Sequence, residues 1–533
     1  MIVEQRTPVD TILIDGSALT LDAIFSVATR DSYRVRIAPT AINAMRAARD
    51  LKEGLVNDGR AIYGVSTGFG DSVIRQVGPA KTAELQRNLI RYHVNGTGPD
   101  APRDVVRATM LIRANCLARG RSGIRPEVVE TLIDLLNADA LPLVPERGSV
   151  GASGDLVPLC HVASPLIGEG TLNHRGEKHP AAQVLDELGL KPVTLESKEG
   201  LALINGTSFS SAFAAIAATR ARRLIPIVEL CTALASEAIL GNRGHFAPFI
   251  HHSKPHPGQV AAAAAIADRL ADSGLALDHS QVVDLTGVLG LAHYAELVRS
   301  IQDRYSIRCA PHVIGVLRDT LSWASDWIEV EINSANDNPL FDVTTGEVHS
   351  GGNFYGGHIA QAMDSVKTAV ANVADLLDRQ LELIVDEKFN NGLTPNLIPR
   401  FADNEWRAGL HHGFKGMQIA CSAITAEALQ RSVPASVFSR STEAHNQDKV
   451  SMSAMAARDA LHVVSLVEEV AAIHLLAACQ ALDLRGVDRS ASRSRAAYAL
   501  IRDLVPGLGD DRPMAGDIAA ALGLIRSGAL LAV

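Results

Sequence analysis

The densest group of small residues in the 533-residue chain is the segment Glu146-Arg147-Gly148-Ser149-Val150-Gly151-Ala152-Ser153-Gly154-Asp155-Leu156. Glycine, alanine and serine let the backbone fold tightly on itself, and Asp155 is predicted to cap a helix over residues 156–167. A turn that only caps this helix and a phosphate-binding loop are both open interpretations. The segment lacks the Gly-Lys-Ser/Thr ending of a P-loop, and Asp155 stands where a nucleophile elbow needs glycine.

Other residues with chemical capacity are spread along the chain. Tyr63 lies in a glycine-rich loop, where a tyrosine on its own is typical of a surface aromatic that pins the loop. Arg308 has the planar fork that holds a carboxylate, or it pairs with Asp303 on a helix surface. Asn338 precedes a proline in an Asn-rich segment that is also typical of a plain turn. Taken singly, none of these residues decides a function.

Three neighbouring histidines, His251, His252 and His256, form the chain's clearest metal-like pattern. No cysteine or carboxylate lies among them, and adjacent histidines rarely face one metal. We therefore expect no metal site.

Taken in order, the segments resemble the aromatic amino-acid ammonia-lyase and 2,3-aminomutase family, which includes histidine, phenylalanine and tyrosine ammonia-lyases. The resemblance runs from about Tyr63 to Leu482 and centres on Ala152-Ser153-Gly154. It implies that this tripeptide cyclises and loses two water molecules to form 4-methylideneimidazole-5-one (MIO), with no metal and no external cofactor. The Gly154 nitrogen must attack the Ala152 carbonyl carbon, so neither residue can be bulky. Dehydration of Ser153 then leaves the electrophilic methylidene.

The resemblance also implies roles for single residues. Tyr63 would remove the β-proton of the substrate, and Tyr305 would be a second catalytic residue close to the MIO. Because a tyrosine ordinarily has a pKa near 10, the Tyr63 phenolate is expected to need positive surroundings. Arg308 would bind the substrate carboxylate. The residues expected around the substrate are Tyr92, His93, Asn205, Gln302, Arg308, Asn338, Phe354, Lys415, Glu443, Asn446 and Gln447.

The choice of substrate is predicted from the pair Tyr92-His93. In the family, phenylalanine enzymes tend to have Phe-Leu at this pair, whereas tyrosine enzymes place a histidine in it. A His or Tyr can hydrogen-bond a buried phenol, and a site built to do so discriminates strongly. Histidine enzymes also carry a histidine there, but they have glutamate where this chain has Gln447. We expect L-tyrosine first, L-phenylalanine second and histidine third, each converted to ammonia and a trans-cinnamate-type acid.

Two alternatives to an ammonia-lyase stay open. Asp71 follows the tyrosine loop at a position where some tyrosine aminomutases have glutamate, so a 2,3-aminomutase that returns the amine to the β-carbon is one alternative. A non-catalytic helical scaffold is the other, because fold does not imply function. Such a scaffold should have lost the Ala-Ser-Gly triad, Tyr63 or Arg308, and all are present.

The elements that must position these residues are predicted to be mainly α-helical. Apolar residues recur every three or four positions over 359–384, and 210–240, 313–331 and 450–482 read as further long helices. Such long apolar stripes need partners, which favours a helical bundle. The resemblance implies an elongated central bundle of the ammonia-lyase, fumarase-like type and a smaller mixed N-terminal region that bears the MIO.

The boundaries are predicted near residues 200 and 485. They give an MIO-bearing domain over 1–200, a long-helix domain over 201–485 and a small helical tail over 486–533. Hairpin strands are expected around residues 170–175.

Composition narrows the range of partners. With 50 Lys and Arg against 59 Asp and Glu, the net charge of −9 argues against nucleic acid. Apolar stretches such as 470–482 fall short of the roughly 20 residues that span a bilayer, so no membrane is expected. Six scattered cysteines suggest reduced thiols and the cytoplasm. The resemblance further implies a homotetramer in which each active site is assembled from three subunits.

Overall fold

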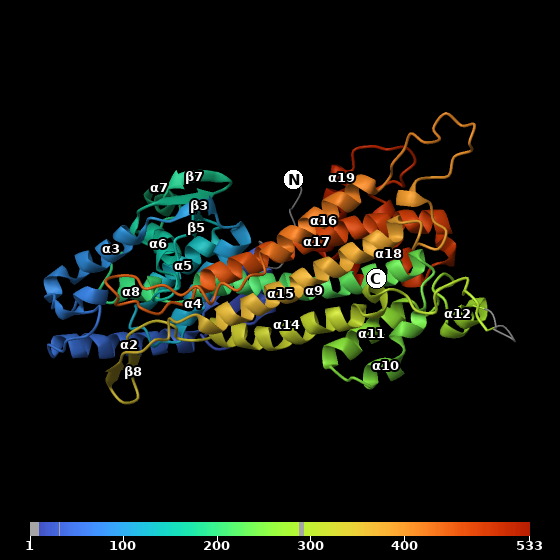
Figure 1. The fold of residues 1–533 in the computed structure, drawn as a ribbon. Helices are drawn as coiled ribbons and strands as arrows, with labels where there is room; N and C mark the ends of the chain where they lie inside the picture. Colours follow the sequence, from blue (N-terminus) through green and yellow to red (C-terminus); the bar gives the residue numbers. More distant parts are fainter. Residues whose placement is uncertain (1–9, 31, 287–292) are drawn as a thin grey trace. The chain divides into compact units, whose positions relative to one another are not determined.

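The protein is mainly helical, as predicted (Figure 1). The computed structural model describes residues 10–30, 32–286 and 293–533. The chain forms two compact units, each built from segments that are distant in the sequence. The first unit comprises Met1–Thr219, Ala324–Asp364 and Pro434–Leu461, and the second comprises Arg220–Trp323, Ser365–Val433 and His462–Val533. The predicted boundaries near residues 200 and 485 stay a prediction.

The four long helices predicted from apolar periodicity are all present. They are α9 (Ser208–Ala238), α14 (Ala310–Ile332), α15 (Gly357–Val385) and α17 (Ser453–Arg485). Their buried side chains are mostly alanine, leucine, valine and isoleucine, as the aromatic-poor composition requires. Small side chains allow helix axes to approach closely, which favours long parallel or antiparallel packing.

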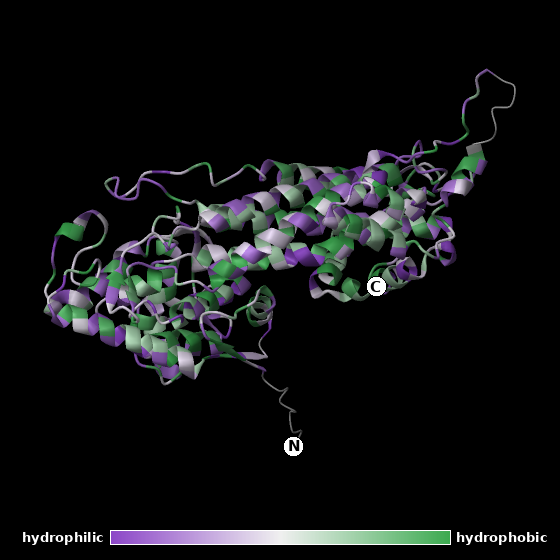
Figure 2. Cartoon of the chain, turned by 90° about the horizontal axis from the view of Figure 1, so that it is seen from below, coloured by the Kyte–Doolittle hydropathy of each residue, from purple (hydrophilic) through white to green (hydrophobic). Residues whose placement is uncertain are grey.

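In the second unit these helices form a bundle held by buried apolar faces and a few polar contacts. Gln380 on α15 donates to the hydroxyl of Thr232 on α9 at 3.0 Å. Arg318 on α14 donates to the buried carboxylate of Glu229 on α9 at 2.6 Å. Figure 2 shows hydrophobic and hydrophilic residues alternating along the long helices, which is the pattern of helices with one face against a core.

The remaining helices of the second unit are shorter. They are α10 (Pro248–His252), α11 (Pro257–Arg269), α12 (His279–Thr286), α13 (Tyr305–Arg308), α16 (Lys415–Gln430), α18 (Ser492–Arg502) and α19 (Ala515–Ser527). The predicted helical tail corresponds to α18 and α19.

The first unit mixes shorter helices with small sheets. Its helices are α1 (Leu21–Thr29), α2 (Pro39–Asn57), α3 (Thr82–His93), α4 (Arg103–Ala118), α5 (Pro126–Asn137), α6 (Leu156–Ala163), α7 (Ala181–Glu187) and α8 (Glu199–Ile204). Its strands are β1 (Asp10–Ile14), β2 (Tyr33–Ile37), β3 (Thr97–Asp100), β4 (Leu141–Pro142), β5 (Pro145–Arg147), β6 (Thr171–His174), β7 (Glu177–Pro180), β8 (Leu340–Asp342) and β9 (Glu347–His349).

The sheets of the first unit are small and mostly antiparallel. β1 and β2 pair in parallel, whereas β3 pairs with β5 and β8 with β9 in antiparallel fashion. β6 lies between β4 and β7, and the β6–β7 turn is the hairpin expected around residues 170–175.

Among the described residues, one helix, α17, satisfies the length and composition of a membrane span. The apolar part of α17 is longer than the 470–482 stretch considered from the sequence. However, 83% of its most apolar window is buried inside the protein. Burial of this kind is what a core helix shows.

Candidate active site

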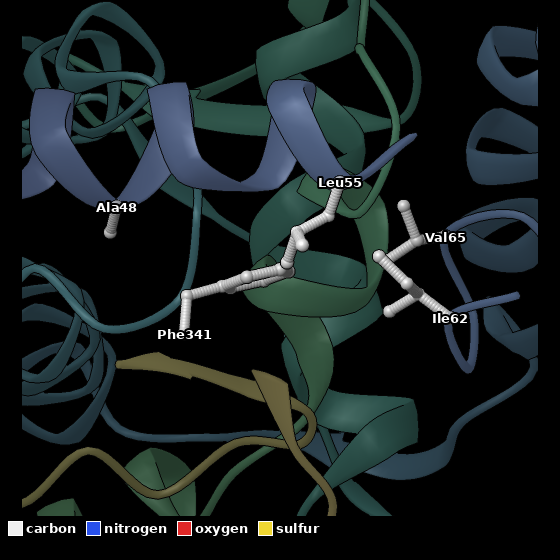
Figure 3. Close-up of a cluster of buried hydrophobic side chains, with 5 residues drawn as sticks. All are labelled: Ala48, Leu55, Ile62, Val65 and Phe341. Atoms are coloured by element: carbon white, nitrogen blue, oxygen red, sulfur yellow. The ribbon is translucent and has the colours of Figure 1, made fainter. Parts of the chain in front are cut away.

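The loop that carries Tyr63 is anchored on both sides by the core of the first unit. Ile62 and Val65 are buried and belong to a cluster with Leu55 of α2 and Phe341 of β8 (Figure 3). Because Ile62 and Val65 are fixed in this cluster, the backbone on either side of Tyr63 is held in place, although the loop is irregular.

The environment of Tyr63 favours the neutral phenol. Its hydroxyl oxygen accepts a hydrogen bond from the Gly70 N–H at 3.0 Å. Burial raises the pKa of Tyr63, the Gly70 hydrogen bond lowers it, and the nearby Glu443 carboxylate raises it again. Among the described residues, Lys449 is the only Lys or Arg that lines the pocket around Tyr63.

The Ala152-Ser153-Gly154 segment has the geometry of a tight turn. Ser153 and Gly154 both have positive φ, at 52° and 76°. A Cβ on Gly154 would lie 2.1 Å from the Gly206 carbonyl oxygen, so no other residue fits there. Ala152 is buried against Val450 and Met452. These features match the demand that cyclisation places on the first and third residues of the triad.

Both oxygen atoms of Ser153 lie within hydrogen-bond distance of side-chain amides. Asn205 donates through Nδ2 to the Ser153 carbonyl oxygen at 2.7 Å, and Gln447 Nε2 lies 3.5 Å from the Ser153 hydroxyl. In turn, the buried Arg113 donates to the Asn205 carbonyl oxygen at 3.2 Å. Ring closure would remove the Ala152 oxygen as one water molecule, and dehydration would remove the Ser153 hydroxyl as a second. The Ser153 carbonyl, with its Asn205 donor, would remain. The residues present therefore fit MIO.

Asp155 does not cap the helix that follows it, so the prediction of a side-chain cap is wrong. It occupies the N-cap position of α6, but its side chain makes no bond to that helix. Its carboxylate instead accepts from the Ser210 N–H of α9 at 2.7 Å and from the Ser149 hydroxyl at 2.9 Å. Free N–H groups in the first turn of α9 attract a carboxylate equally well. Asp155 therefore ties the Ala152–Gly154 turn to α9. The helix itself ends at Ala163 rather than Ile167, and 164–167 form a 3₁₀ turn.

A cavity of about 530 Å³ in the first unit brings many of the predicted residues together. The predicted residues that line it are Tyr63, Tyr92, His93, Ala152, Ser153, Asn205, Asn338, Phe354, Glu443, Asn446 and Gln447. Asp71 is outside the lining, although its N–H donates to Glu443 at 2.9 Å. The other Glu443 oxygen accepts from Asn446 Nδ2 at 2.7 Å. One wall of the cavity is thus a carboxylate facing the phenol of Tyr63.

Four predicted residues belong to the second unit and do not line this cavity: Gln302, Tyr305, Arg308 and Lys415. Tyr305 is 70% exposed, and the Arg308 guanidinium carbon lies 4.4 Å from the centre of its ring. Arg308 thus stacks on Tyr305, whereas Asp303 accepts from the Asn242 N–H at 2.6 Å. Lys415 is exposed at the first position of α16.

His93 and Tyr92 lie side by side at the end of α3, with ring centroids 4.4 Å apart. His93 Nδ1 lies 2.9 Å from the Leu89 carbonyl oxygen, which can only accept. Burial lowers the pKa of His93, so the ring is neutral and Nδ1 carries the hydrogen. Nε2 is then a hydrogen-bond acceptor on a side chain that lines the cavity.

Two groups behind the cavity were not identified from the sequence. Gln86 is fully buried on α3 and bonds the backbone at Gly64 and Leu201. Lys198 and Asp337, both fully buried, form an ion pair at 2.7 Å beside Asn338. Helical spacing places Gln86 on the same face as Leu89 and His93, and this spacing could have identified Gln86 from the sequence. Nothing in the local sequence around Lys198 indicates its partner.

The histidine group in the second unit has an ordinary structural role. The two ring nitrogens of His251 lie 3.0 Å from the His245 carbonyl oxygen and 3.1 Å from the Gln259 amide nitrogen. In the described part of the chain, no group of three or more His, Cys, Asp or Glu side chains is arranged to hold a metal.

Comparison with known proteins decides between a scaffold and an enzyme family. The sequence matches the family described as "Aromatic amino acid lyase" over residues 19–503. The chain belongs to the aromatic amino acid lyase family. The family assigns the chain to the carbon–nitrogen lyases, as the order of motifs predicted.

The similarity of this lyase to individual family members extends over nearly its whole length. It is 42% identical to histidine ammonia-lyase of Stigmatella aurantiaca, covering 97% of each chain. It is 41% identical to tyrosine ammonia-lyase of Cupriavidus metallidurans, covering 98% of this chain and 97% of the relative. The crystal structure of tyrosine aminomutase from Streptomyces globisporus superposes with a TM-score of 0.91 at 37% identity, covering 98% of both chains. The fold and family are thus shared by enzymes with three different activities.

Proposed function

We propose that this aromatic amino acid lyase deaminates L-tyrosine to a trans-cinnamate-type acid and ammonia. The observation that carries the choice of substrate is the neutral His93 in the cavity lining, whose Nε2 would be a hydrogen-bond acceptor for the substrate. A tyrosine phenol can donate to it, whereas phenylalanine would leave this half-buried acceptor without a partner from the substrate. Unpaired polar groups in a site are what give strong discrimination. L-Phenylalanine is the second candidate, and histidine is the third because Gln447 offers no negative charge to an imidazole.

MIO formed from Ala152, Ser153 and Gly154 would supply the electrophile that activates the substrate amine for elimination. Asn205 would hold its carbonyl oxygen, and Arg113 keeps the Asn205 segment in place. Glu443 and Asn446 present acceptor oxygens toward the cavity, where a substrate ammonium group would bind. Asn338 and Phe354 complete the cavity wall around the side chain.

Tyr63 is the proposed base for the β-proton, and it needs a further cation besides Lys449, which lines the same cavity. We propose that neighbouring copies of the chain supply it in a homotetramer, together with Gln302, Tyr305, Arg308 and Lys415. Arg308 would then bind the substrate carboxylate with its guanidinium fork. The ring of Tyr305 is exposed, and the half-buried Arg308 stacks on it. The buried free cysteines support a reducing, cytoplasmic location.

A tyrosine 2,3-aminomutase is the second candidate function. The similarity to the S. globisporus aminomutase supports it, as does the contact between the Asp71 backbone and Glu443.

The test is product analysis by chromatography after incubation of the purified enzyme with L-tyrosine, L-phenylalanine and L-histidine. We expect coumarate and ammonia from L-tyrosine as the fastest reaction. A His93→Phe variant should lose preference for tyrosine over phenylalanine, whereas Tyr92→Phe, which keeps the histidine, should retain it. β-Tyrosine as main product would support the aminomutase, and neither coumarate nor β-tyrosine would refute both tyrosine activities.

A further inference from the structure

The side-chain amide of Gln86 links two backbone segments of the active site. Gln86 Nε2 donates to the Gly64 carbonyl oxygen at 3.0 Å, and Gln86 Oε1 accepts from the Leu201 N–H at 3.0 Å. The side chain is fully buried. Both ends of the amide are therefore used, and only one orientation satisfies both backbone groups.

The segments that Gln86 joins carry different parts of the site. Gly64 directly follows Tyr63, while Leu201 lines the cavity and lies on α8, the helix that leads into Asn205. Gln86 itself lies on α3, seven residues before His93 and on the same helical face. One amide thus connects the base, the residue that holds the Ser153 carbonyl and the substrate-selecting pair.

The packing around Gln86 leaves little room for these segments to shift independently. A Cβ on Gly200 would lie 2.7 Å from the Gln86 backbone oxygen, so α3 and α8 are in direct backbone contact. Backbone hydrogen bonds such as the one from the Gly68 N–H to the Arg75 carbonyl oxygen hold the far side of the Tyr63 loop. Among the described residues, the Gln86 amide is the partner of the Gly64 carbonyl oxygen, so it fixes the backbone directly after Tyr63.

We propose that Gln86 is a positioning residue that fixes the Tyr63 loop against α3 and α8 so that the phenol meets the substrate β-proton. The proposal rests on the proposed role of Tyr63 as the base. Gln86 does not touch the substrate; it acts through Gly64 and Leu201. If the loop were less tightly held, the site would still bind the amino acid, but the Tyr63 phenol would not be aligned with the β-proton.

The first test is Gln86→Met, which keeps the volume and removes both hydrogen bonds. The rate is expressed per MIO-bearing site, counted by mass spectrometry, so that incomplete maturation does not count as slow chemistry. We expect kcat to fall by about 100-fold with little change in KM, since a misplacement of about 1 Å costs that much. Asn88→Ala, at an exposed position on the same helix, should keep wild-type kcat. Wild-type kcat per site in Gln86→Met would overturn the proposal.

The second test is Gln86→Glu, which tests the positioning role of Gln86 even if the methionine variant does not fold. The carboxylate still accepts from Leu201 but repels the Gly64 carbonyl oxygen, whereas the protonated acid can donate to it. Because burial raises the pKa of a carboxyl group, the kcat of this variant relative to wild type should rise as pH falls from about 9 to about 6. A ratio that stays at one across this range would contradict the positioning role.

The outcomes separate this inference from the proposed function. If Tyr63→Phe keeps full turnover, the assignment of the base fails whatever Gln86 does. If Tyr63→Phe abolishes turnover and both Gln86 variants match wild type per site, only the positioning role fails.

Discussion

Asn205 Nδ2 lies 2.7 Å from the Ser153 carbonyl oxygen, and it is the side-chain donor to that atom. The donor is itself fixed, because Arg113 holds the Asn205 carbonyl and the neighbouring Gly206 carbonyl accepts from the Asp155 N–H. A preorganised donor of this kind is worth most where negative charge develops during a reaction. We therefore expect Asn205 to matter more for rate than for substrate affinity.

Replacing Asn205 with alanine tests this relationship. Loss of one such donor typically lowers kcat by about 100-fold to 1000-fold. Steady-state kinetics with L-tyrosine should show this fall with a smaller change in KM, and the mass of the Ser153 peptide should show whether the MIO still forms. A variant with intact MIO and unchanged kcat would exclude Asn205 as a functional donor.

The buried ion pair between Lys198 and Asp337 should be important for stability. Both side chains are fully buried, with Lys198 Nζ also 3.3 Å from the Asn338 carbonyl oxygen. Removing one partner leaves an uncompensated buried charge, so Lys198→Met should cost about 3–5 kcal/mol in the free energy of unfolding. The double variant with Asp337→Asn should recover part of this loss.

Chemical denaturation followed by circular dichroism measures both effects. The exposed pair Lys178–Asp100 is a matched control, and Lys178→Met should change stability by less than about 1 kcal/mol. Equal effects of Lys198→Met and Lys178→Met would show that burial of the first pair has no energetic consequence.

The buried His474 should make the free energy of unfolding of the second unit fall at acid pH. It is fully buried on α17, and in the described part of the chain neither ring nitrogen has a hydrogen-bond partner. Burial lowers the pKa of His474 to about 3, below the ordinary value of 6.5. Between these values the unfolded chain binds the proton and the folded chain does not. The contribution of this group to stability is therefore complete above pH 6.5 and is lost as pH falls toward 3.

The matching experiment compares wild type and His474→Met by chemical denaturation at pH 7 and pH 5. At about 1.4 kcal/mol per pKa unit, the wild type should lose roughly 2 kcal/mol more than the variant over this interval. An identical loss in both proteins would mean that His474 is not the group that responds to acid.

Active sites assembled from several copies of the chain predict complementation between inactive variants. Tyr63→Phe alters the first unit and Arg308→Ala the second, and each variant should be inactive alone. Co-expression of the two variants should give randomly mixed tetramers with about one quarter of wild-type activity. In such tetramers about half of the sites receive an intact Tyr63, and about half of those also receive an intact Arg308 from another copy of the chain. Activity that stays at the level of the single variants would indicate sites complete within one chain.

The sequence predicted the helical fold well because its strongest signals are local. Apolar residues at helical spacing located α9, α14, α15 and α17 to within a few residues. Eleven of the residues predicted from the short motifs line one cavity, because each motif carries its own candidate residue. Composition alone indicated an alanine- and leucine-rich core.

The features that escaped prediction depend on long-range contacts. The partner of Asp155 is the N–H of Ser210, 55 residues away, so local spacing wrongly suggested a cap on α6. The role of Gln86 depends on Gly64 and Leu201, which come from two other segments. No local pattern indicates that distant parts of the chain combine into each of the two units. Tertiary packing creates these relationships, and no single window of sequence contains them.

The formation of MIO from Ala152, Ser153 and Gly154 is tested most directly by the intact mass of the purified chain. We predict a mass lower than that of the sequence by two water molecules, with the loss confined to the peptide that contains Ser153. The Ser153→Ala variant should not show this loss of two water molecules and should be inactive. An active enzyme whose mass equals that of the unmodified chain would contradict the proposed chemistry of the site.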